Sequence, residues 1–590
     1  MLPHPALAAI ERLNAASHGD AMQWLEGVYE HSPWVADKAL QHRPFRSLTH
    51  VKWALADAVS HAPRDQQLAL LRAHPVLAPK PAAGLTASSH HEQHSAGLWQ
   101  CTPAQAQQLQ QLNADYLKHF GWPFIVAVKG PRGSGLGPQA IVQSLQRRLL
   151  ASPVDEFQEC LRQIHRIAEL RLNDKCATQP TLGQEVGDWH EWLAQFSDEG
   201  FAQRGELSVS YLTPAHRACA QTLKLGMQAC GFDEVTIDAV GNVVGRYHPA
   251  VDGSRYVLTG SHYDTVRNGG KYDGRLGIFV PMACVRELAR AKRRLSVGIE
   301  VVAFSEEEGV RYKATFLASS ALTGHFQSSW LDQTDAEGIS MRQAMQNAGL
   351  NPQDIPALTR DASRYVGFIE VHIEQGPVLH GLNLPLGIVT SINGSRRYLG
   401  EILGTASHAG TTPMSLRHDA AAALAEWSVY LEQRAVQDGD SVATIGMLSV
   451  PNGSINVVPG RCSFSLDMRA PTDAQRDALA EDVLQALSRI CERRDLRHRL
   501  EETVRASAAP SDPQLQQAWE SAVSSLGIPL YRLPSGAGHD AMQLHRVMPQ
   551  AMLFVRGENQ GISHNPLEST TADDMQLAIE AFQHTIELLN

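Results

Sequence analysis

The 590-residue chain lacks a run of about 18–20 consecutive apolar residues, which is the length that a membrane-spanning helix needs. It also lacks an excess of positive charge: the formal net charge is −11, which argues against a general affinity for nucleic acid. The N-terminal sequence MLPHPALAAIERL has no basic start followed by an apolar core. We therefore expect no signal peptide, no membrane partner and a cytoplasmic location.

Cysteine is scarce as well, with eight residues scattered along the chain and no CxxC pair. This pattern argues against cysteine-ligated zinc and is typical of a reducing compartment. Histidine, by contrast, is plentiful at 26 residues. With 43% hydrophobic and 19% charged residues the composition is that of a globular protein, and the length indicates about four structural units of ~150 residues.

The chain changes character once. Residues 1–173 show apolar residues at helical spacing, as in QQLALLRAHPVL and PVDEFQECLRQIHRIAELRL, which predicts an all-α domain. Residues 174–186 lose this periodicity and are predicted to be a linker. Beyond them, short β-branched runs such as VGIEVVAF alternate with helical stretches, which predicts α/β architecture.

Side chains that bind metals follow several of the predicted strands. His262 and Asp264 end one strand and face the same side, so Asp264 can accept a hydrogen bond from the His262 ring. Further candidates stand in KYDGRLG, SEEEGVRY, FIEVHIEQG and GISHNPLE: Asp273, Glu306, Glu307, Glu308, His372 and His564. Ligands gather at the carboxyl ends of strands in an open α/β sheet, so this pattern favours a two-metal site for Zn²⁺, Mn²⁺ or Co²⁺.

Three adjacent glutamates hold like charges close together. A solvated turn would tolerate them, and so would nearby cations that offset the repulsion and lower the carboxyl pKa values. The accompanying histidines and Asp273 favour the metal interpretation.

The segments GSHYDTV, YDGRLG, EEEGVRY, EVHIEQGPVL, SHAGTTPM and SGAGHDAM…GISHNPLE together resemble the dinuclear amidohydrolases of the M20 metallopeptidase superfamily. The branch is that of allantoate amidohydrolase, N-carbamoyl-L-amino-acid hydrolase and β-alanine synthase. The resemblance covers about residues 187–590 and implies two divalent metal ions per subunit, Mn²⁺ or Zn²⁺. The implied ligands are His262, Asp273, Glu308, His372 and His564, with Asp273 bridging.

The same resemblance implies Glu307 as the general base, with Asp264 in the catalytic set. Glu306 and Glu307 could instead be the base and ligand pair, but the family pattern Glu-Glu-Gly-x-Arg-aromatic selects Glu307 and Glu308. Glu306 is then expected to be a solvated flank.

The family architecture implies a catalytic domain over residues 187–390 and 501–590, with an inserted α/β lid domain over residues 391–500 that forms a homodimer. In relatives the histidine matching His408 reaches into the partner's active site. The other implied substrate contacts are Gln375, Asn456, Arg469, Gly538 and His539. The Arg469 guanidinium suits a substrate carboxylate, although a surface ion pair is the alternative.

The N-terminal segments LLRAHPVLAPK, SSHHEQHSAGL, NADYLKHFGWPFIVAVKG and IAELRL resemble OHCU decarboxylase, which acts on 2-oxo-4-hydroxy-4-carboxy-5-ureidoimidazoline. The resemblance covers residues 1–173 and implies His74 as the catalytic acid, without a cofactor. The implied substrate contacts are Pro75, Ser89, Glu92, Phe124, Ile125, Val126, Ala127 and Arg171. His90 and His91 depart from the pattern, and with His94 they could instead form a metal cluster.

Together the resemblances imply a bifunctional enzyme of purine degradation that acts on small ureides. It would convert OHCU to (S)-allantoin and hydrolyse allantoate to ureidoglycine, ammonia and CO2. One alternative is an N-carbamoyl-L-amino-acid hydrolase, or another ureido-acid amidohydrolase. A second is that the helical domain serves only structure or dimerisation.

Overall fold

A computed structural model describes residues 6–77, 89, 92, 102–133 and 135–590, which form two compact units. The first unit is Met1–Ile388, Gln517–Tyr531 and Leu553–Asn590, and the second is Val389–Gln516 and Arg532–Met552. Among the described residues, no helix has the length and apolar character needed to cross a membrane. The alternative metal cluster of His90, His91 and His94 lies outside the described residues.

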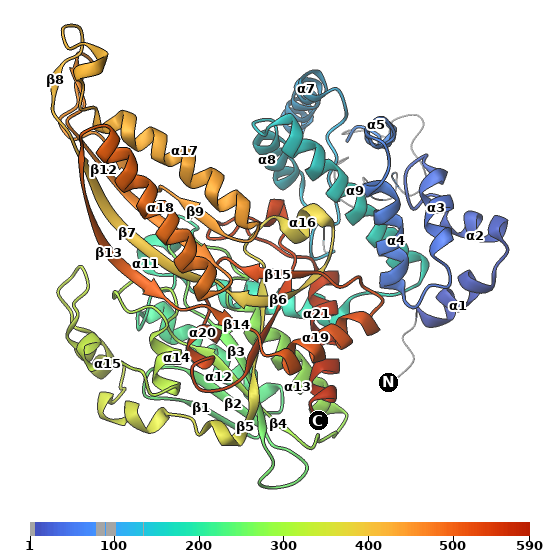
Figure 1. Ribbon diagram of the computed structural model, residues 1–590. Helices are drawn as coiled ribbons and strands as arrows, with labels where there is room; N and C mark the ends of the chain where they lie inside the picture. The colour runs from blue at the N-terminus through green and yellow to red at the C-terminus, as the bar shows by residue number, and fades with distance from the viewer. Residues whose placement is uncertain (1–5, 78–88, 90–91, 93–101, 134) are drawn as a thin grey trace. The chain divides into compact units, whose positions relative to one another are not determined.

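In the N-terminal part of the first unit, the described residues form helices joined by loops and contain no strand (Figure 1). Its helices are α1 (Leu7–Ala15), α2 (His18–Leu25), α3 (Pro33–Ala39), α4 (Leu48–Ser60), α5 (Arg64–Ala73), α7 (Pro103–Phe120), α8 (Pro138–Arg148) and α9 (Pro153–Lys175). Helices α7 and α9 begin with a capping Thr102 or Ser152 followed by proline, the arrangement that satisfies free backbone N–H groups at a helix start. Helix α9 is the longest of them, and most of its residues are buried.

The predicted linker is mostly helical. Helix α9 continues to Lys175, and α10 (Thr181–Ala194) begins six residues later, so part of residues 174–186 belongs to two helices. Gly183 weakens the helical signal in the sequence, but a Cβ there would lie 1.9 Å from the Ala572 carbonyl oxygen. The glycine therefore allows α10 to pack closely against α21 (Ala572–Leu588).

The α/β part of the first unit is built on a mixed sheet. Its strands β1 (Glu234–Ile237), β2 (Val243–Tyr247), β4 (Gly298–Phe304), β3 (Tyr256–His262) and β5 (Tyr365–Ile373) are neighbours in this order. Strand β3 is parallel to both β4 and β5, with His262 opposite Phe304. The carboxyl ends of the three strands consequently meet at one edge, which is the arrangement that the sequence pattern required.

The second unit has its own five-stranded sheet, in the order β10 (Leu448–Ser449), β12 (Arg461–Ala470), β7 (Gly394–Leu403) and β13 (Arg497–Ala506), with β9 (Val442–Thr444) also on β12. Helices α17 (Ala420–Asp438) and α18 (Asp473–Arg493) pack on it around Trp427, Phe464 and Met468. Beyond this sheet, β8 (Ser407–His408) pairs with β11 (Val457–Val458). The expected boundary at residue 500 falls inside β13, which pairs with β7 along its whole length.

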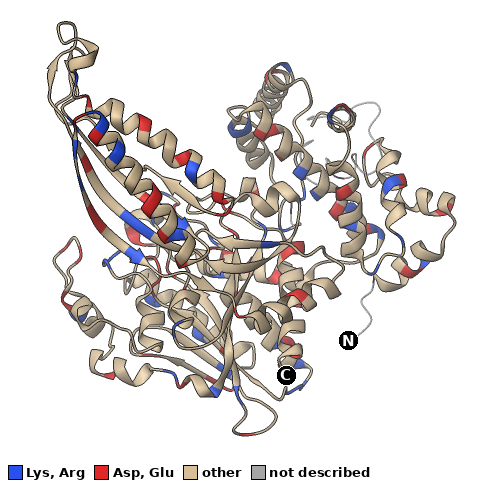
Figure 2. Cartoon of the chain, in the orientation of Figure 1, with Lys and Arg blue, Asp and Glu red and all other residues tan. Residues whose placement is uncertain are grey.

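Charges of both signs are interspersed along the chain (Figure 2). The many arginines and carboxylates pair with one another, as at Arg246 with Glu300 and Arg434 with Asp482.

Candidate active sites

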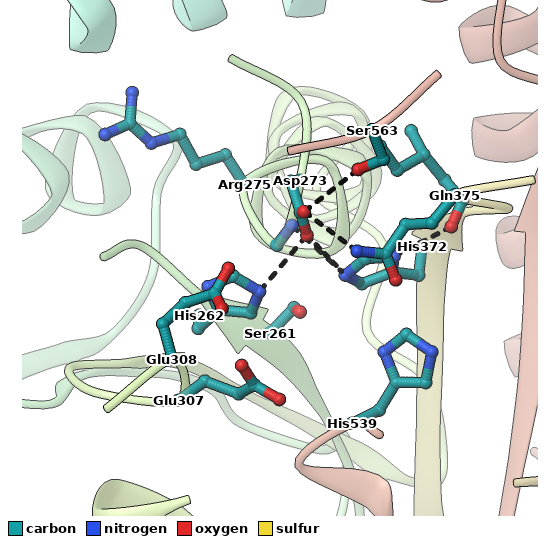
Figure 3. A network of polar contacts seen from close by, with 12 residues as sticks. Ser261, His262, Asp273, Arg275, Glu307, Glu308, His372, Gln375, His539 and Ser563 are labelled. Carbon is teal, nitrogen blue, oxygen red and sulfur yellow. Dashed lines mark hydrogen bonds and ion pairs between the residues drawn. The ribbon is translucent and has the colours of Figure 1, made fainter. Parts of the chain in front are cut away.

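The strand-end residues of the first unit converge on one carboxylate, Asp273, in the turn before α13 (Leu276–Arg290) (Figure 3). Its Oδ1 atom lies 3.4 Å from Nε2 of His262 and 3.3 Å from Nε2 of His372. Its Oδ2 atom lies 3.3 Å from Nε2 of His564. The two oxygens of Asp273 thus face different histidines, as a bridging ligand requires.

Three groups of potential ligands consist of first-unit residues alone: His262 with Asp273 and His372, Asp273 with Glu308 and His564, and His262 with Glu307 and Glu308. Within each group the ligand atoms lie within 4.8 Å of one another. Imidazole nitrogens and carboxylate oxygens suit Zn²⁺ or Mn²⁺. Asp273 belongs to two of the groups, so the donors fit a pair of cations that share it.

The local electrostatics indicate uncompensated negative charge. Burial and the charge of Asp273 raise the pKa of Glu308 to about 7. Contact with Asp273 raises the pKa of His564 to about 9. The negative charge of Asp273 thus favours the protonated form of both groups, and bound cations would offset the same charge.

Asp264 supports both the histidine and the glutamates. Its Oδ1 atom lies 3.3 Å from Nδ1 of His262. Its carboxylate also accepts hydrogen bonds from the backbone N–H groups of Glu307 and Glu308, at 3.2 and 3.1 Å. Asp264 therefore fixes the ring of one candidate ligand and the loop that carries two others.

The expectation that Glu306 is a solvated flank is wrong. Its side chain is 1% exposed, because α14 (Leu317–Leu322) covers the chain after β4 and Ala318 donates a backbone hydrogen bond to the Glu306 carbonyl at 3.3 Å. Burial and the charge of Asp264 raise its pKa well above the usual range. Glu306 belongs to none of the potential metal groups among the described residues.

Two residues of the site are in the left-handed backbone region that non-glycine residues rarely adopt: Gln375 at φ 57° and His564 at φ 53°. Gln375 was expected to contact substrate, and its Nε2 atom donates to Asp273 at 2.8 Å. Its backbone strain thus serves to hold an amide against the central carboxylate.

Sequence reasoning missed Glu568 and Ser563. One oxygen of Glu568 accepts hydrogen bonds from the backbone N–H groups of Tyr272 and Asp273, both at 2.9 Å. The Ser563 hydroxyl lies 2.8 Å from the other oxygen of Glu568 and 3.2 Å from Asp273, so it can donate to either carboxylate. Both residues stand in the segment GISHNPLE, so the signal was present in a motif already singled out.

The remaining predicted contacts lie in the second unit. His408 on β8 is exposed and pairs in register with Val457, and the carbonyl of Asn456 accepts from Ala409 at 2.9 Å. Arg469 donates to Asp467 at 2.8 Å and to the Gly536 carbonyl at 2.6 Å, so the ion-pair alternative exists in the structure. His539, next to Gly538, is buried and lies 2.9 Å from the Ser535 hydroxyl.

In the helical part, most of the predicted decarboxylase residues line one small cavity. The residues that share it are His74, Pro75, Leu77, Ser89, Glu92, Phe124, Ile125, Val126, Val128, Ile167 and Arg171. Ala127 is buried but is not part of this lining, and its backbone N–H is bonded to Gln163 at 2.9 Å.

Arg171 organises the polar side of this cavity. It donates to Glu92 at 2.8 and 2.9 Å, to Ser89 at 3.2 Å and to Glu30 at 2.8 Å. Glu30, which also accepts from Ser89 at 3.0 Å, carried no signal in the sequence. Burial lowers the pKa of His74 to about 4, so the ring is neutral at neutral pH.

Comparisons with known proteins assign the helical part and the α/β part of the chain to two different families. Residues 258–588 match the sequence model of peptidase family M20/M25/M40, and residues 14–173 match that of OHCU decarboxylase.

The relatives of the C-terminal part carry two kinds of name. The N-carbamoyl-L-amino acid amidohydrolase of Geobacillus stearothermophilus is 39% identical over 67% of this chain and 96% of its own length. The allantoate amidohydrolase of Bacillus subtilis is 34% identical over 68% of this chain and 96% of its own length. A hydantoinase/carbamoylase family amidase from Burkholderia ambifaria has a similar structure, with TM-score 0.63 and 30% identity over 69% of this chain and 97% of its own.

Proposed function

Because the chain belongs to peptidase family M20/M25/M40 and carries an OHCU decarboxylase domain at its N-terminus, we propose that it is a bifunctional enzyme of purine degradation. The N-terminal domain decarboxylates OHCU to (S)-allantoin. The C-terminal part hydrolyses allantoate with one water molecule to ureidoglycine, CO2 and ammonia. The substrates of both sites are small ureides.

The observation that carries this proposal is the presence of both families in one chain. OHCU decarboxylation yields allantoin, and opening of the allantoin ring yields allantoate. Allantoate hydrolysis is the next step. A chain that catalyses OHCU decarboxylation and allantoate hydrolysis therefore carries the first and third reactions of one route. An amidohydrolase for carbamoyl amino acids would have no chemical connection to its N-terminal domain.

In the amidohydrolase site, two divalent cations, when bound, supply Lewis acidity that makes a ureido carbonyl more electrophilic. The residues that would hold them are His262, Asp273, Glu308, His372 and His564. The Glu307 carboxylate takes a proton from the attacking water and passes it to the leaving nitrogen. Asp264 keeps this base in place through the Glu307 backbone N–H, at 3.2 Å.

In the decarboxylase site, the neutral His74 ring retains one N–H. Loss of CO2 leaves a delocalised anion, and a proton from His74 reaches one face of it, which sets the handedness of allantoin. The His74 side chain is buried and shares the lining of the cavity with the apolar residues Phe124, Ile125 and Ile167. Arg171 and its carboxylate partners orient the ureido and carboxyl groups.

The second unit is proposed to be a lid through which two chains dimerise. Arg469 pairs with Ser395 at one end of the β7–β12 ladder, and Arg461 pairs with Leu403 at the other. These positions are ~26 Å apart at the usual rise per strand residue, and His408 follows Leu403. His408 and Arg469 would therefore serve different active sites. Exposed apolar side chains in this unit, Met414, Leu416 and Ile455 among them, support a contact with a second copy.

The identity of 39% to an N-carbamoyl-L-amino acid amidohydrolase favours a second candidate substrate class. The chain loaded with Mn²⁺ should be tested with allantoate and with a panel of N-carbamoyl-L-amino acids. We expect a kcat/KM for allantoate at least ~10-fold higher, a difference of about 1.4 kcal/mol in transition-state stabilisation. A faster reaction with a carbamoyl amino acid would establish the second candidate. As a control, a chelator should abolish hydrolysis and leave OHCU decarboxylation unchanged.

A further inference from the structure

Helix α9 of the helical domain carries several charged residues that are almost fully buried, and three of them pair with the C-terminal segment of the chain. Arg162 is 2% exposed, Arg166 1% and Glu169 8%. Charged side chains are rarely buried unless other charges satisfy them, so their partners matter. Those partners lie some 400 positions away, in the segment 556–574 of the same compact unit.

The start of this segment is held by Arg162. Its Nε atom donates to Glu558 at 2.9 Å. The segment then closes on itself, because the Glu558 N–H donates to the Ser569 carbonyl at 2.7 Å and the Asn559 amide to the Leu567 carbonyl at 2.7 Å. Residues 558–569 therefore form a closed loop attached to α9 by an ion pair.

The end of the segment is held as well. Asp573, in the first turn of α21, accepts from Lys52 at 2.7 Å and from Asn173 at 2.9 Å, and it pairs with Arg166. Burial disfavours its charge, but Lys52 and Arg166 overcome this and hold its pKa far below the usual range. Arg166 also donates to the Pro131 carbonyl, which accepts the N–H of Ala572 too, each at 3.0 Å.

The closed loop carries three residues of the candidate metal site. His564 lies 3.3 Å from Asp273, the Ser563 hydroxyl lies 3.2 Å from Asp273, and Glu568 accepts the Asp273 N–H at 2.9 Å. A displacement of this loop would move one face of the donor set relative to His262 and His372, which belong to the sheet.

A second contact connects α9 to the turn that carries Gln375. Glu159 of α9 lies 3.3 Å from His380 on α16 (Val378–Leu382), and both are buried. The loop packs against the same turn, because a Cβ on Gly561 would lie 1.6 Å from the Gly376 carbonyl oxygen. Both segments that approach Asp273 from outside the sheet therefore rest on α9.

We propose that Arg162 and Glu558 are positioning residues for the metal site, so that the helical domain is a structural part of the hydrolase. This inference rests on the proposed metal-binding role of Asp273, Glu308 and His564. It gives the N-terminal domain a task in hydrolysis in addition to its own pocket. The ion pair acts by holding the loop at the position where His564 and Glu308 can bind the same cation.

The test compares full-length variants. Arg162→Met removes the guanidinium but keeps an unbranched side chain, and Glu558→Gln removes the opposite charge at nearly constant size. Arg148→Met is the matched control, because Arg148 is also buried and pairs with α9, but with Glu156 at 2.6 Å and the Ile125 carbonyl at 2.8 Å. Binding of Mn²⁺ alone is measured by titration calorimetry, together with thermal unfolding and allantoate kinetics.

Arg162→Met and Glu558→Gln should raise the Kd of the more weakly bound Mn²⁺ about tenfold or more, the effect usual for outer partners of metal ligands. Arg148→Met should lower the unfolding temperature and leave Mn²⁺ affinity unchanged. Arg162→Lys, which can restore the charge and one hydrogen bond to Glu558, should recover part of the affinity. If Arg162→Met does not fold, the Mn²⁺ affinity of Glu558→Gln alone tests the positioning role.

An unchanged Mn²⁺ affinity in a folded Glu558→Gln protein, with a lower unfolding temperature only, would overturn the positioning role. If the wild-type chain binds Mn²⁺ but does not hydrolyse allantoate, the proposed substrate is wrong. The Mn²⁺ affinities of the variants and the wild type would still test the positioning role. Wild-type chain that binds no divalent cation would overturn both.

Discussion

At the scale of single residues, three consecutive glutamates have three different surroundings. Glu306 is enclosed next to Asp264, Glu307 lies in the group with His262 and Glu308, and Glu308 lies 3.6 Å from His564. Of the three glutamates, Glu308 alone belongs to two of the potential ligand groups, one with His262 and Glu307 and one with Asp273 and His564. The arrangement supports Glu308 as the ligand and Glu307 as the base.

Replacing these glutamates one at a time separates their roles. Glu307→Gln should keep its metal but lose turnover by several orders of magnitude, because the base and the activated water act together. Glu308→Gln should instead weaken metal binding. Metal content and the rate with allantoate, measured on both proteins, decide the assignment. Loss of metal from Glu307→Gln with retention in Glu308→Gln would move the base to Glu306.

His74 permits a test of the other site. His74→Ala should abolish enzymatic OHCU decarboxylation and leave allantoate turnover unchanged, because the two sites use separate residues. Uncatalysed decay of OHCU gives racemic allantoin, so the measurement is the enantiomeric composition of the product. An excess of (S)-allantoin formed by this variant would exclude His74 as the proton donor.

At the scale of elements, the β8–β11 pair decides whether one chain suffices. Arg469 lies near one end of the second-unit sheet, and the β8–β11 pair follows the other end. We therefore expect His408 to act in the partner's site. A hydrogen-bond donor that polarises the scissile carbonyl contributes roughly 3–4 kcal/mol to transition-state stabilisation. His408→Ala should therefore be nearly inactive on its own.

Mixing two inactive proteins checks this expectation. His408→Ala and Glu307→Gln chains, unfolded and refolded together, should form heterodimers in which one site carries both defects and the other carries none. An equal mixture should regain about a quarter of wild-type activity, since half of the dimers are mixed and half of their sites are intact. Heterodimers verified by mass that remain inactive would place His408 in its own chain's site or in neither.

At the scale of the whole molecule, buried neutral histidines make stability depend on pH. Burial lowers the pKa of His190 to about 3, and its Nδ1 atom lies 2.7 Å from the Val186 carbonyl. Below pH ~6.5 the unfolded chain binds a proton at this residue that the folded chain does not. The stabilising contribution is complete above that pH and is lost as pH falls toward 3.

The free energy of unfolding should therefore fall by about 1.4 kcal/mol per pH unit for this histidine within the window. His190→Gln, which can keep the bond to Val186, should show a smaller loss of unfolding temperature between pH 7 and pH 5 than the wild type. The exposed His18 pairs with Asp37 at 3.0 Å, and His18→Gln is the control that should not reduce the loss. Equal losses in all three proteins would contradict the prediction.

Much of the site was predictable because its functional residues stand at the ends of strands that the sequence pattern reveals. Parallel strands bring their carboxyl ends to one edge, so His262, His372 and the glutamates after β4 had to be neighbours once the strands were recognised. The helical character of the first 173 residues followed from apolar periodicity in the same way. The linker was predicted too long, because Gly183 serves a close helix contact that a local pattern does not show.

The sequence alone determined which residue types meet at Asp273 and which two protein families share the chain, because both are encoded in short segments with fixed local geometry. Only the tertiary structure decided that Glu306 is buried, that Glu30 binds Arg171 of the helical domain's cavity and that α9 holds the loop of His564. Arg162 and Glu558 are 396 residues apart. A contact over that separation depends on how the domains pack, and periodicity and motif spacing describe only neighbours along the chain.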